Sequence, residues 1–361
     1  MPQVKRLGLR PLRYALVAGA LLSLAVAGWA GLVRIGWPWP AFREEVLLSH
    51  GPLMVTGFVG TLVGVIRALR SLEAVGLIPP VLSATASVAA IAVPGTPLGP
   101  VLGIAAALAL LATTLRTWRA GRRPALALLG LAAMAWAIGD ALWLGEGQGG
   151  AATAWWMAFA ALAITGQRVD TDPRLGEKGR PLLGIAVLLI LLGALTVAVR
   201  GPEGLRVFGL GAIALVAWGV RGDLIERRRH VGSRRYLRFL VLAMASAYLW
   251  LAVSGGLALF LGAAPYDAIV HALFAGFVLS AIFAHAPAFV PGVLGRAVVF
   301  RTAAYVPLAL LDIAVLGRVV ATVVVSPDGQ RWSSLLIGIA VLLFIANAGT
   351  SLRDRRPLPA T

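Results

Sequence analysis

Long apolar stretches, separated by short polar segments, recur along the whole chain. Each is close to or above the roughly 18 residues with which an α-helix crosses a hydrocarbon layer about 30 Å thick. The twelve stretches lie at about 14–35, 47–67, 74–94, 99–117, 124–145, 151–168, 181–199, 204–221, 237–263, 267–289, 302–324 and 333–351. The third is the least regular, because Pro79, Pro80 and Pro94 interrupt it. The pattern predicts an all-α polytopic membrane bundle of about twelve transmembrane helices, forming a single domain over residues 1–361.

The composition agrees with a membrane location. Hydrophobic residues make up 59% of the 361 residues and charged residues only 13%, whereas soluble domains carry roughly 25% charged residues. The mean hydropathy is +0.88. There is no cysteine, which excludes disulfides, thiolate metal sites and cysteine nucleophiles. The basic segment Met1–Tyr14 lacks a small-residue cleavage site, so we expect the first apolar stretch to be retained as a span.

The distribution of basic residues predicts the topology. With the N-terminus inside, most of the 32 Lys and Arg residues fall on the inner side, as expected for cytoplasmic loops. The exceptions are Arg34, Arg43, Arg200, Arg206 and Arg331 on the outer side and Arg318 within a span. We therefore expect both termini to be cytoplasmic, in a multi-pass protein of a bacterial inner membrane. The net charge of +17 then reflects topology, and the lipid bilayer, not nucleic acid, is the expected partner.

Two of the four histidines lie at matching depths. In this topology the second and tenth spans run in the same direction, and His50 and His271 each lie within about one turn of the outer end. Neutral imidazole binds iron, copper and zinc, and haem iron commonly takes axial histidine. Two such histidines on different helices could hold one porphyrin between them. The alternative is a pair of interfacial histidines bonded to carbonyls or water.

A stripe of small residues follows the first of these histidines. If the second span is a regular α-helix, one face carries His50, Met54, Gly57, Thr61 and Gly64. Small residues allow either a flat macrocycle or a neighbouring helix to approach closely. Both interpretations, haem packing and helix packing, remain open at this point.

The other two histidines are less suited to the same site. His285 follows His271 by fourteen residues, which is about 21 Å along a helix, so the two cannot bind one metal ion. A packing or capping role is expected for His285, with metal binding as the alternative. His230 lies in a basic cytoplasmic loop and is expected to be solvated.

These motifs resemble known membrane haem proteins. His50-Gly51-x-x-Met54 entering a glycine-bearing second span resembles the second helix of subunit I of the haem-copper oxidases, in which the corresponding histidine and one on the tenth helix bind a low-spin haem. The closer likeness is to NnrS-type proteins, through the segment 271–278, His-Ala-Leu-Phe-Ala-Gly-Phe-Val, and the later His285-Ala286-Pro287. That family is described as containing haem and copper and as connected with nitric oxide metabolism. The resemblance implies haem packing at Met54, Gly57 and Gly276.

The chain also departs from the oxidase pattern. Oxidases carry copper ligands on the sixth and seventh helices, and the corresponding stretches here contain no histidine. The tenth also lacks a His-x-His pair. A binuclear centre that reduces oxygen or nitric oxide therefore has no visible ligands, and copper is doubtful. The resemblance implies one b-type haem without the oxidase machinery.

Charged residues inside the spans provide further candidates. Asp312 and Arg318 lie in the eleventh span, and a separation of six residues places them on different faces. Buried ionisable groups in a membrane default to functional hypotheses. Arg318 is expected to pair with Asp140, with Asp267 or with a haem propionate, while Arg331, and Arg34 near Trp37, are further propionate candidates.

The leading hypothesis is an NnrS-like membrane protein with His50 and His271 as axial ligands of haem b near the outer face. Its role would be electron transfer or nitric-oxide-linked metabolism, and whether it is an enzyme stays open. The alternative is a cofactor-free transporter or scaffold with incidental histidines, in which Asp140, Asp312 and Asn347 could line a path. Motifs of soluble hydrolases or kinases do not occur.

Overall fold

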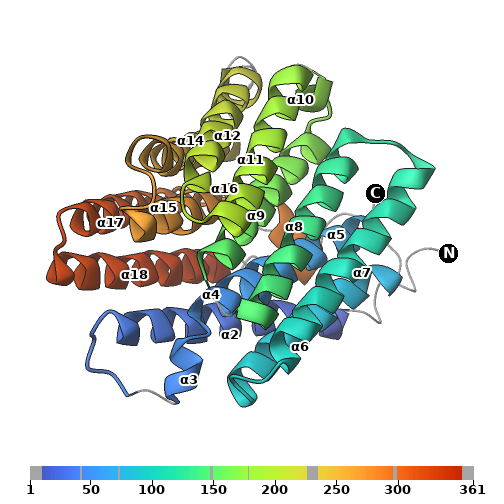
Figure 1. The fold of residues 1–361 in the computed structure, drawn as a ribbon. Coiled ribbons are helices and arrows are strands. Elements are labelled where there is room, and N and C mark those ends of the chain that lie inside the picture. Colours follow the sequence, from blue (N-terminus) through green and yellow to red (C-terminus); the bar gives the residue numbers. More distant parts are fainter. Residues whose placement is uncertain are drawn as a thin grey trace. The chain divides into compact units, whose positions relative to one another are not determined.

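The computed structural model describes seven stretches of the chain, and all of them are helical or connecting segments (Figure 1). These stretches are residues 10–40, 43–71, 74–146, 149–177, 179–225, 235–295 and 299–351. No β-strand occurs within them. The prediction of an all-α protein is confirmed.

Eleven helical segments among the described residues are long and apolar enough to cross a membrane. They are Pro11–Arg34, His50–Arg70, Ala74–Ala92, Leu98–Ala120, Pro124–Gly145, Arg180–Arg200, Gly204–Gly222, Arg235–Leu261, Tyr266–Leu294, Thr302–Val323 and Pro327–Ser351. Large apolar side chains such as Leu22, Phe260 and Leu342 are more than half exposed, as suits helices that face lipid. The polytopic bundle is therefore confirmed.

The sixth predicted stretch corresponds to α9 (Gly150–Thr171), which is not among these eleven segments. Its last turns carry polar residues, including Gln167, Arg168 and Asp170. Most of its side chains are buried against other helices. A helix surrounded by protein does not need a continuous apolar surface, and this explains the lower apolar content of α9.

Two compact units can be distinguished within the chain. Unit 1 contains residues 1–180 and 190–207, and unit 2 contains residues 181–189 and 208–361. The helix α11 (Arg180–Arg200) contributes to both units, and α12 (Gly204–Gly219) begins in unit 1 and continues in unit 2.

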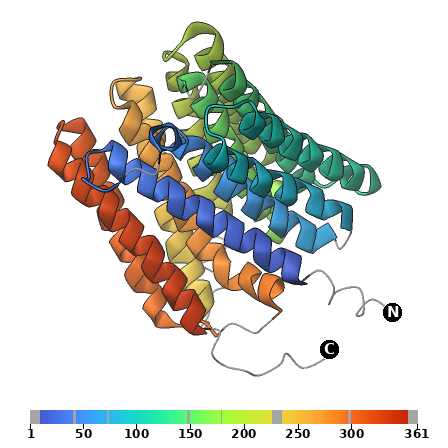
Figure 2. The same ribbon diagram turned by 90° about the horizontal axis from the view of Figure 1, so that it is seen from below.

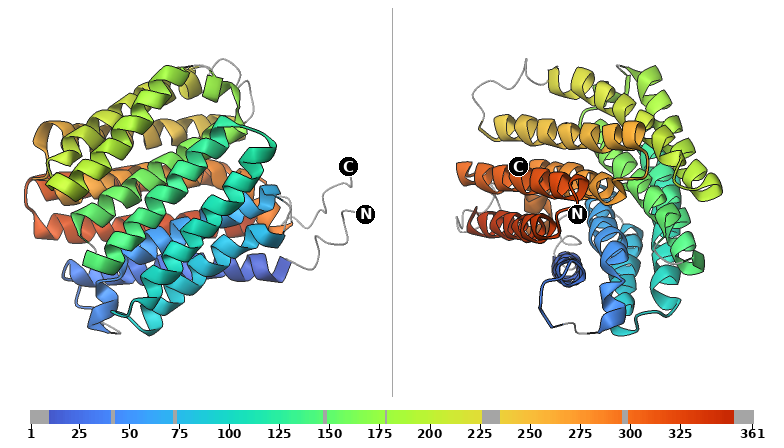
Figure 3. Two further views of the ribbon diagram at one scale, coloured as in Figure 1. Left: turned by 45° about the vertical axis from the view of Figure 1, so that its right-hand side comes forward. Right: turned by 60° about the vertical axis from the view of Figure 1, so that its left-hand side comes forward.

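Unit 1 is built around four long helices that follow one another in the chain. The helices α6 (Ile78–Ala92), α7 (Leu98–Ala120), α8 (Pro124–Glu146) and α9 pack each against the next (Figure 3). The remaining elements are α2 (Arg10–Arg34), α3 (Glu44–Leu47), α4 (His50–Pro52), η1 (Leu53–Gly60), α5 (Thr61–Ser71), η2 (Ala74–Leu77) and α10 (Arg174–Glu177). Both α2 and α6 pack against η1.

Unit 2 contains two neighbouring groups of helices. The helices α17 (Tyr305–Val323) and α18 (Pro327–Ser351) form an antiparallel pair joined by a short turn (Figure 2). The helix α14 (Arg235–Leu261) packs against the successive elements α15 (Tyr266–His271), η4 (Ala272–Val278) and α16 (Leu279–Leu294). The short elements η3 (Val220–Ile225) and η5 (Thr302–Ala304) complete the unit.

The prolines of the third predicted span do not break its helix. Pro79 and Pro80 occupy the first turn of α6, where a backbone N–H has no intrahelical partner and its loss costs little. Pro94 follows the helix, which ends at Ala92. The interruption predicted from the sequence is therefore a helix start and a helix end.

The second and tenth predicted spans each change to a π-helix immediately after their histidine. In unit 1 the π-helix η1 begins three residues after His50, and in unit 2 the π-helix η4 begins directly after His271. Such i→i+5 segments are rare and occur frequently at functional sites. They direct attention to the surroundings of the two histidines.

Candidate functional site

His50 is anchored to the neighbouring helix α2. Its Nδ1 lies 2.7 Å from the carbonyl oxygen of Ala27. Because a carbonyl oxygen can only accept, Nδ1 carries the proton, and in the neutral ring Nε2 carries the lone pair. A Cβ at Gly31 would lie 2.8 Å from Cε1 and Nδ1 of His50, so the imidazole fits against α2 because that position is a glycine.

The stripe that follows His50 packs against two neighbouring helices. A Cβ at Gly57 would meet the side chains of Ser23 on α2 and Ser87 on α6, and one at Gly64 would meet Pro80 on α6. The wider turns of η1 rotate the later positions relative to a regular α-helix. The glycines of the stripe thus make the contacts expected of helix packing, one of the two interpretations left open by the sequence.

Met54 is partly buried within the same region of unit 1. It packs against the buried apolar cluster of Ala27, Leu53 and Ala90. Its side chain therefore lies beside the segment of α2 that accepts the hydrogen bond from His50.

A buried carboxyl group lies on the other side of η1. Asp140 is fully buried on α8. One of its oxygens accepts a hydrogen bond of 2.8 Å from Trp156 Nε1, and both oxygens lie 3.0 Å from the Thr56 hydroxyl. Trp136 Nε1 donates to the same hydroxyl at 3.1 Å. The network joins η1 to α8 and α9, and it satisfies Asp140 with neutral donors, not with Arg318 as one of the sequence alternatives proposed.

The hydroxyl network of unit 1 continues toward α6. Ser83 donates to the carbonyl oxygen of Thr56 at 2.6 Å, and Thr61 lies 2.9 Å from the Ser83 hydroxyl. A carbonyl oxygen has two lone pairs, so it can accept a hydrogen bond from a side chain as well as one from the backbone. The polar side chains therefore stabilise the irregular segment.

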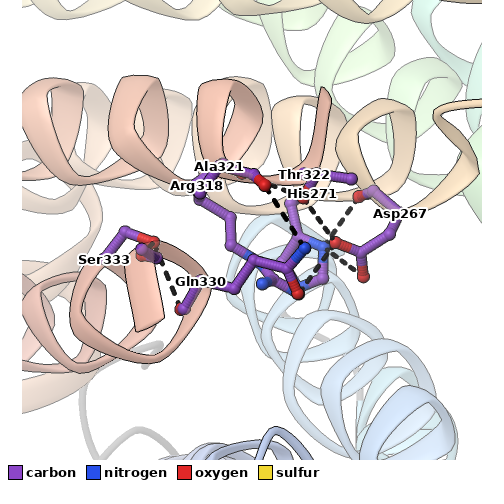
Figure 4. Close-up of polar contacts among 8 residues, drawn as sticks. Asp267, His271, Arg318, Ala321, Thr322, Gln330 and Ser333 are labelled. Carbon is purple, nitrogen blue, oxygen red and sulfur yellow. Dashed lines mark hydrogen bonds and ion pairs between the residues drawn. The ribbon is translucent and has the colours of Figure 1, made fainter. Parts of the chain in front are cut away.

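His271 belongs to a cluster of polar side chains in unit 2 (Figure 4). Its Nδ1 lies 2.8 Å from the Asp267 carbonyl oxygen and 3.2 Å from the Asp267 carboxylate. Both are acceptors, so Nδ1 is the donor and Nε2 carries the lone pair of the neutral ring. The same carboxylate binds Arg318 at 2.8 Å and accepts a hydrogen bond from Thr322 at 3.1 Å. The predicted alternative in which Arg318 pairs with Asp267 is confirmed.

Arg318 retains hydrogen-bonding capacity in this cluster. Its side chain is only 3% exposed, and Nε and Nη1 are buried without a partner among the described residues. Arg331 is the other predicted propionate partner in unit 2. Its side chain is 41% exposed and forms an ion pair with Asp328 at 3.2 Å. Arg318 is therefore the better placed of the two to meet a further anionic group.

Asp312 forms hydrogen bonds with residues other than Arg318. This agrees with the prediction that the two side chains lie on different faces of their helix. One carboxylate oxygen accepts hydrogen bonds from Ser246 at 2.5 Å and from Trp250 Nε1 at 2.8 Å. Trp250 also packs directly on Gly276, where a Cβ would overlap the indole. Gly276, for which the resemblance implied haem packing, is thus in contact with α14.

The remaining histidines lie elsewhere. His285 Nδ1 lies 2.7 Å from the Ala281 carbonyl oxygen one turn earlier on α16, a local arrangement that suits the predicted packing role. His230 lies outside the described residues. Among the residues that the structure describes, no group of three or more His, Cys, Asp or Glu side chains is arranged to hold a metal ion.

Comparison with known sequences places the chain in a family. The model of the family described as Domain of unknown function (DUF8744) matches residues 13–353. The chain belongs to this family. Comparisons with curated proteins and with solved structures gave no match. The match covers both histidines and all the polar networks described above, which therefore lie within the DUF8744 region of the chain.

Several polar contacts in this DUF8744 protein escaped the sequence reasoning although a simple spacing marks them. Trp136 and Asp140 on α8 lie four residues apart, as do Ser246 and Trp250 on α14. Side chains at this spacing share one face of a helix. A search for polar and tryptophan residues at i and i+4 inside apolar spans would have found both networks. The π-helices have no comparable signal.

Proposed function

We propose that this protein is an integral membrane, NnrS-like haem protein in which His50 and His271 supply the axial ligands of one b-type haem. The proposal places the haem near the outer face of the membrane. The observation that carries it is the state of the two imidazoles. In each, Nδ1 donates to a carbonyl oxygen, so that Nε2 is the nitrogen with the lone pair.

This arrangement suits metal ligation. Histidines that bind metals usually donate their second ring N–H to a carbonyl or a carboxylate, which fixes the tautomer and the orientation of the ring. His50 is held by a carbonyl of another helix, and Gly31 accommodates its ring. His271 is held by both a carbonyl and a carboxylate of Asp267. A carboxylate in this position increases the basicity of the ligand nitrogen.

Arg318 supports the proposal from a second direction. A haem carries propionate groups, and each N–H of a guanidinium can donate a charge-assisted hydrogen bond to a carboxylate oxygen. The buried Nε and Nη1 of Arg318 lack acceptors among the described residues, although Nη2 already binds Asp267. We therefore assign Arg318, in preference to Arg331, as the propionate partner.

When bound, a haem would supply one-electron redox chemistry. Two histidine ligands leave the iron without an open position, so the residues of this chain serve to hold and orient the group. This favours electron transfer over turnover of a small molecule. A role in nitric-oxide-linked metabolism is part of the proposal through the resemblance to NnrS-type proteins.

An optical spectrum of the purified protein tests the proposal. The full-length protein in detergent should show a Soret band and the bands of a low-spin bis-histidine haem. His50→Ala and His271→Ala should each abolish or shift these bands. His285→Ala is the matched control, because its Nδ1 is also bonded to a carbonyl, and it should leave the spectrum unchanged. His50→Gly and His271→Gly should recover the bands when imidazole is added.

A colourless protein, or one whose spectrum is unaffected by both substitutions, would contradict the proposal. It would favour the second candidate, a cofactor-free transporter. The observation in favour of that candidate is Asp140, which is fully buried and bonded only to neutral donors among the described residues. Such a group inside a membrane is a typical ion or proton site.

A further inference from the structure

A second unsatisfied arginine lies at the end of α5, in unit 1. Arg67 is only 8% exposed. Its Nε and Nη2 are buried and have no hydrogen-bond partner within the described part of the chain. Arg67 follows His50 by seventeen residues, which is about 25 Å along a helix. It therefore belongs to the opposite end of this span from His50.

The surroundings of Arg67 are positively charged. Arg70 lies on the same helix and Arg123 at the start of α8, and Arg67 experiences the repulsion of both charges. One of the three arginines, Arg70, forms an ion pair with Asp170 on α9.

Close packing of the helices holds this group together. At Gly166 on α9, a Cβ would lie 3.3 Å from the carbonyl oxygen of Ala125. The first turn of α8, which Arg123 immediately precedes, is therefore pressed against the last turns of α9, which carry Asp170. This packing fixes the backbone beside Arg123 and Asp170, whereas the side chains of Arg70 and Arg123 are exposed.

The two unpaired nitrogens of Arg67 have a geometry of their own. Nε and Nη2 carry the parallel N–H groups along one edge of the guanidinium, which is the edge that binds two oxygens of a phosphate or carboxylate at once. Leaving buried donors unpaired destabilises the protein, and neighbouring positive charges add repulsion. An anion bound between Arg67 and the exposed arginines would remove both costs.

We propose that Arg67, Arg70 and Arg123 form a binding site for a phosphate group at this end of unit 1. Arg67 is the fixed donor, and the exposed arginines close over the anion. The phosphate can belong to an anionic phospholipid headgroup, because the site lies at the end of a membrane-spanning helix, or to a soluble phosphate compound. The site is independent of the haem proposal, since it shares no residue with it.

The experiment compares two sources of phosphate with the same protein. Full-length protein is reconstituted in nanodiscs of phosphatidylcholine alone, with added inorganic phosphate, or with a fraction of phosphatidylglycerol. Thermal stability is measured in each, and retained lipids are counted by native mass spectrometry after extraction. The variants are Arg67→Gln, Arg67→Lys, and the matched control Arg119→Gln, which removes the same charge from an exposed position at the end of α7.

We expect wild-type protein to be stabilised by phosphatidylglycerol or by inorganic phosphate, and the source that stabilises identifies the ligand. Arg67→Gln should weaken the apparent affinity about tenfold or more, as expected for loss of two charge-assisted hydrogen bonds. Arg67→Lys, which keeps the charge and loses the paired donors, should weaken it severalfold. Arg119→Gln should have no comparable effect.

Equal effects of Arg67→Gln and Arg119→Gln would show diffuse attraction by surface charge and would overturn the proposal. Wild-type protein alone can also overturn the proposal. It would do so if phosphatidylglycerol and phosphate both failed to stabilise the protein and phosphatidylglycerol were not retained preferentially. The proposal therefore remains testable even if the Arg67 variants do not fold.

Discussion

The buried carboxyl of Asp140 allows a quantitative test of the network in unit 1. Replacement by alanine removes the acceptor of Trp156 Nε1 at 2.8 Å and of the Thr56 hydroxyl at 3.0 Å. Both donors are buried, and each unpaired buried donor costs about 1–3 kcal/mol. Asp140→Ala should therefore destabilise the protein by about 2–6 kcal/mol.

Asparagine at this position should behave differently. Its carbonyl oxygen can still accept from Trp156, and its amide group can donate to the Thr56 hydroxyl, which has lone pairs available. The geometry of the side chain is the same, so we expect Asp140→Asn to cost about 1 kcal/mol or less. The contrast between alanine and asparagine isolates hydrogen bonding from negative charge.

The assay is thermal unfolding of purified protein in detergent, followed by size-exclusion chromatography of heated samples. Asp140→Ala should lower the apparent Tm by several degrees or more, and near-ultraviolet circular dichroism should report the altered tryptophans. Asp328→Ala, which removes an exposed acid paired with Arg331, is the control and should have little effect. If asparagine destabilised as much as alanine, the negative charge itself would be required. That result would refute the explanation by hydrogen bonds alone and would indicate a cation bound to the carboxylate.

Two further substitutions test the surroundings of the histidines. Gly31→Ala should displace the His50 ring, because its Cβ would lie 2.8 Å from the imidazole, and should lower the apparent Tm by the equivalent of about 1–3 kcal/mol. Gly28→Ala, where a Cβ meets nothing within 4 Å, should not. Asp267→Asn should cost about 3 kcal/mol, since it leaves the guanidinium of Arg318 buried without its anion. The double variant with Arg318→Met should recover part of this loss, and an additive result would contradict the pairing.

The helices could be predicted because a long apolar stretch in a membrane protein is sufficient to indicate a helix. Crossing a membrane requires that all backbone groups be bonded within the segment, so a long apolar stretch has few alternatives to a helix. The third span was predicted as well, although Pro79 and Pro80 made it the least regular in the sequence. At the first turn of α6 these prolines are compatible with a helix, and the span runs over Ala74–Ala92.

The candidate site could be predicted only where short-range spacing determines it. Asp267 and His271 are one turn apart, and Arg318 required a carboxylate somewhere within a span. Thr56 could not be identified as a partner of Asp140, because the contact joins residues 84 positions apart. It also depends on the π-helical turn that orients Thr56. Hydrophobic periodicity carries no information on whether a segment adopts i→i+4 or i→i+5 bonding.

The two units use the same local device in segments of unrelated sequence. In unit 1, Gly60 at the end of η1 packs on Trp136, at 2.6 Å from a Cβ placed on the glycine. In unit 2, Gly276 within η4 packs on Trp250. Each indole then donates its N–H into a network that includes a buried or partly buried aspartate.

A π-helical turn is less favourable than an α-helical one, so its presence after both histidines requires compensation. The indole packed on the glycine supplies part of it, and in unit 1 Ser83 adds a hydrogen bond to the Thr56 carbonyl oxygen. Of the three π-helices among the described residues, η1 begins three residues after His50 and η4 directly after His271, whereas η3 follows no histidine. The turn fixes the direction of each helix beyond its histidine, and the Nδ1 hydrogen bond fixes the ring. Histidines that bind metals are commonly fixed by such an Nδ1 hydrogen bond, and for this reason we propose these two as haem ligands and not as incidental interfacial histidines.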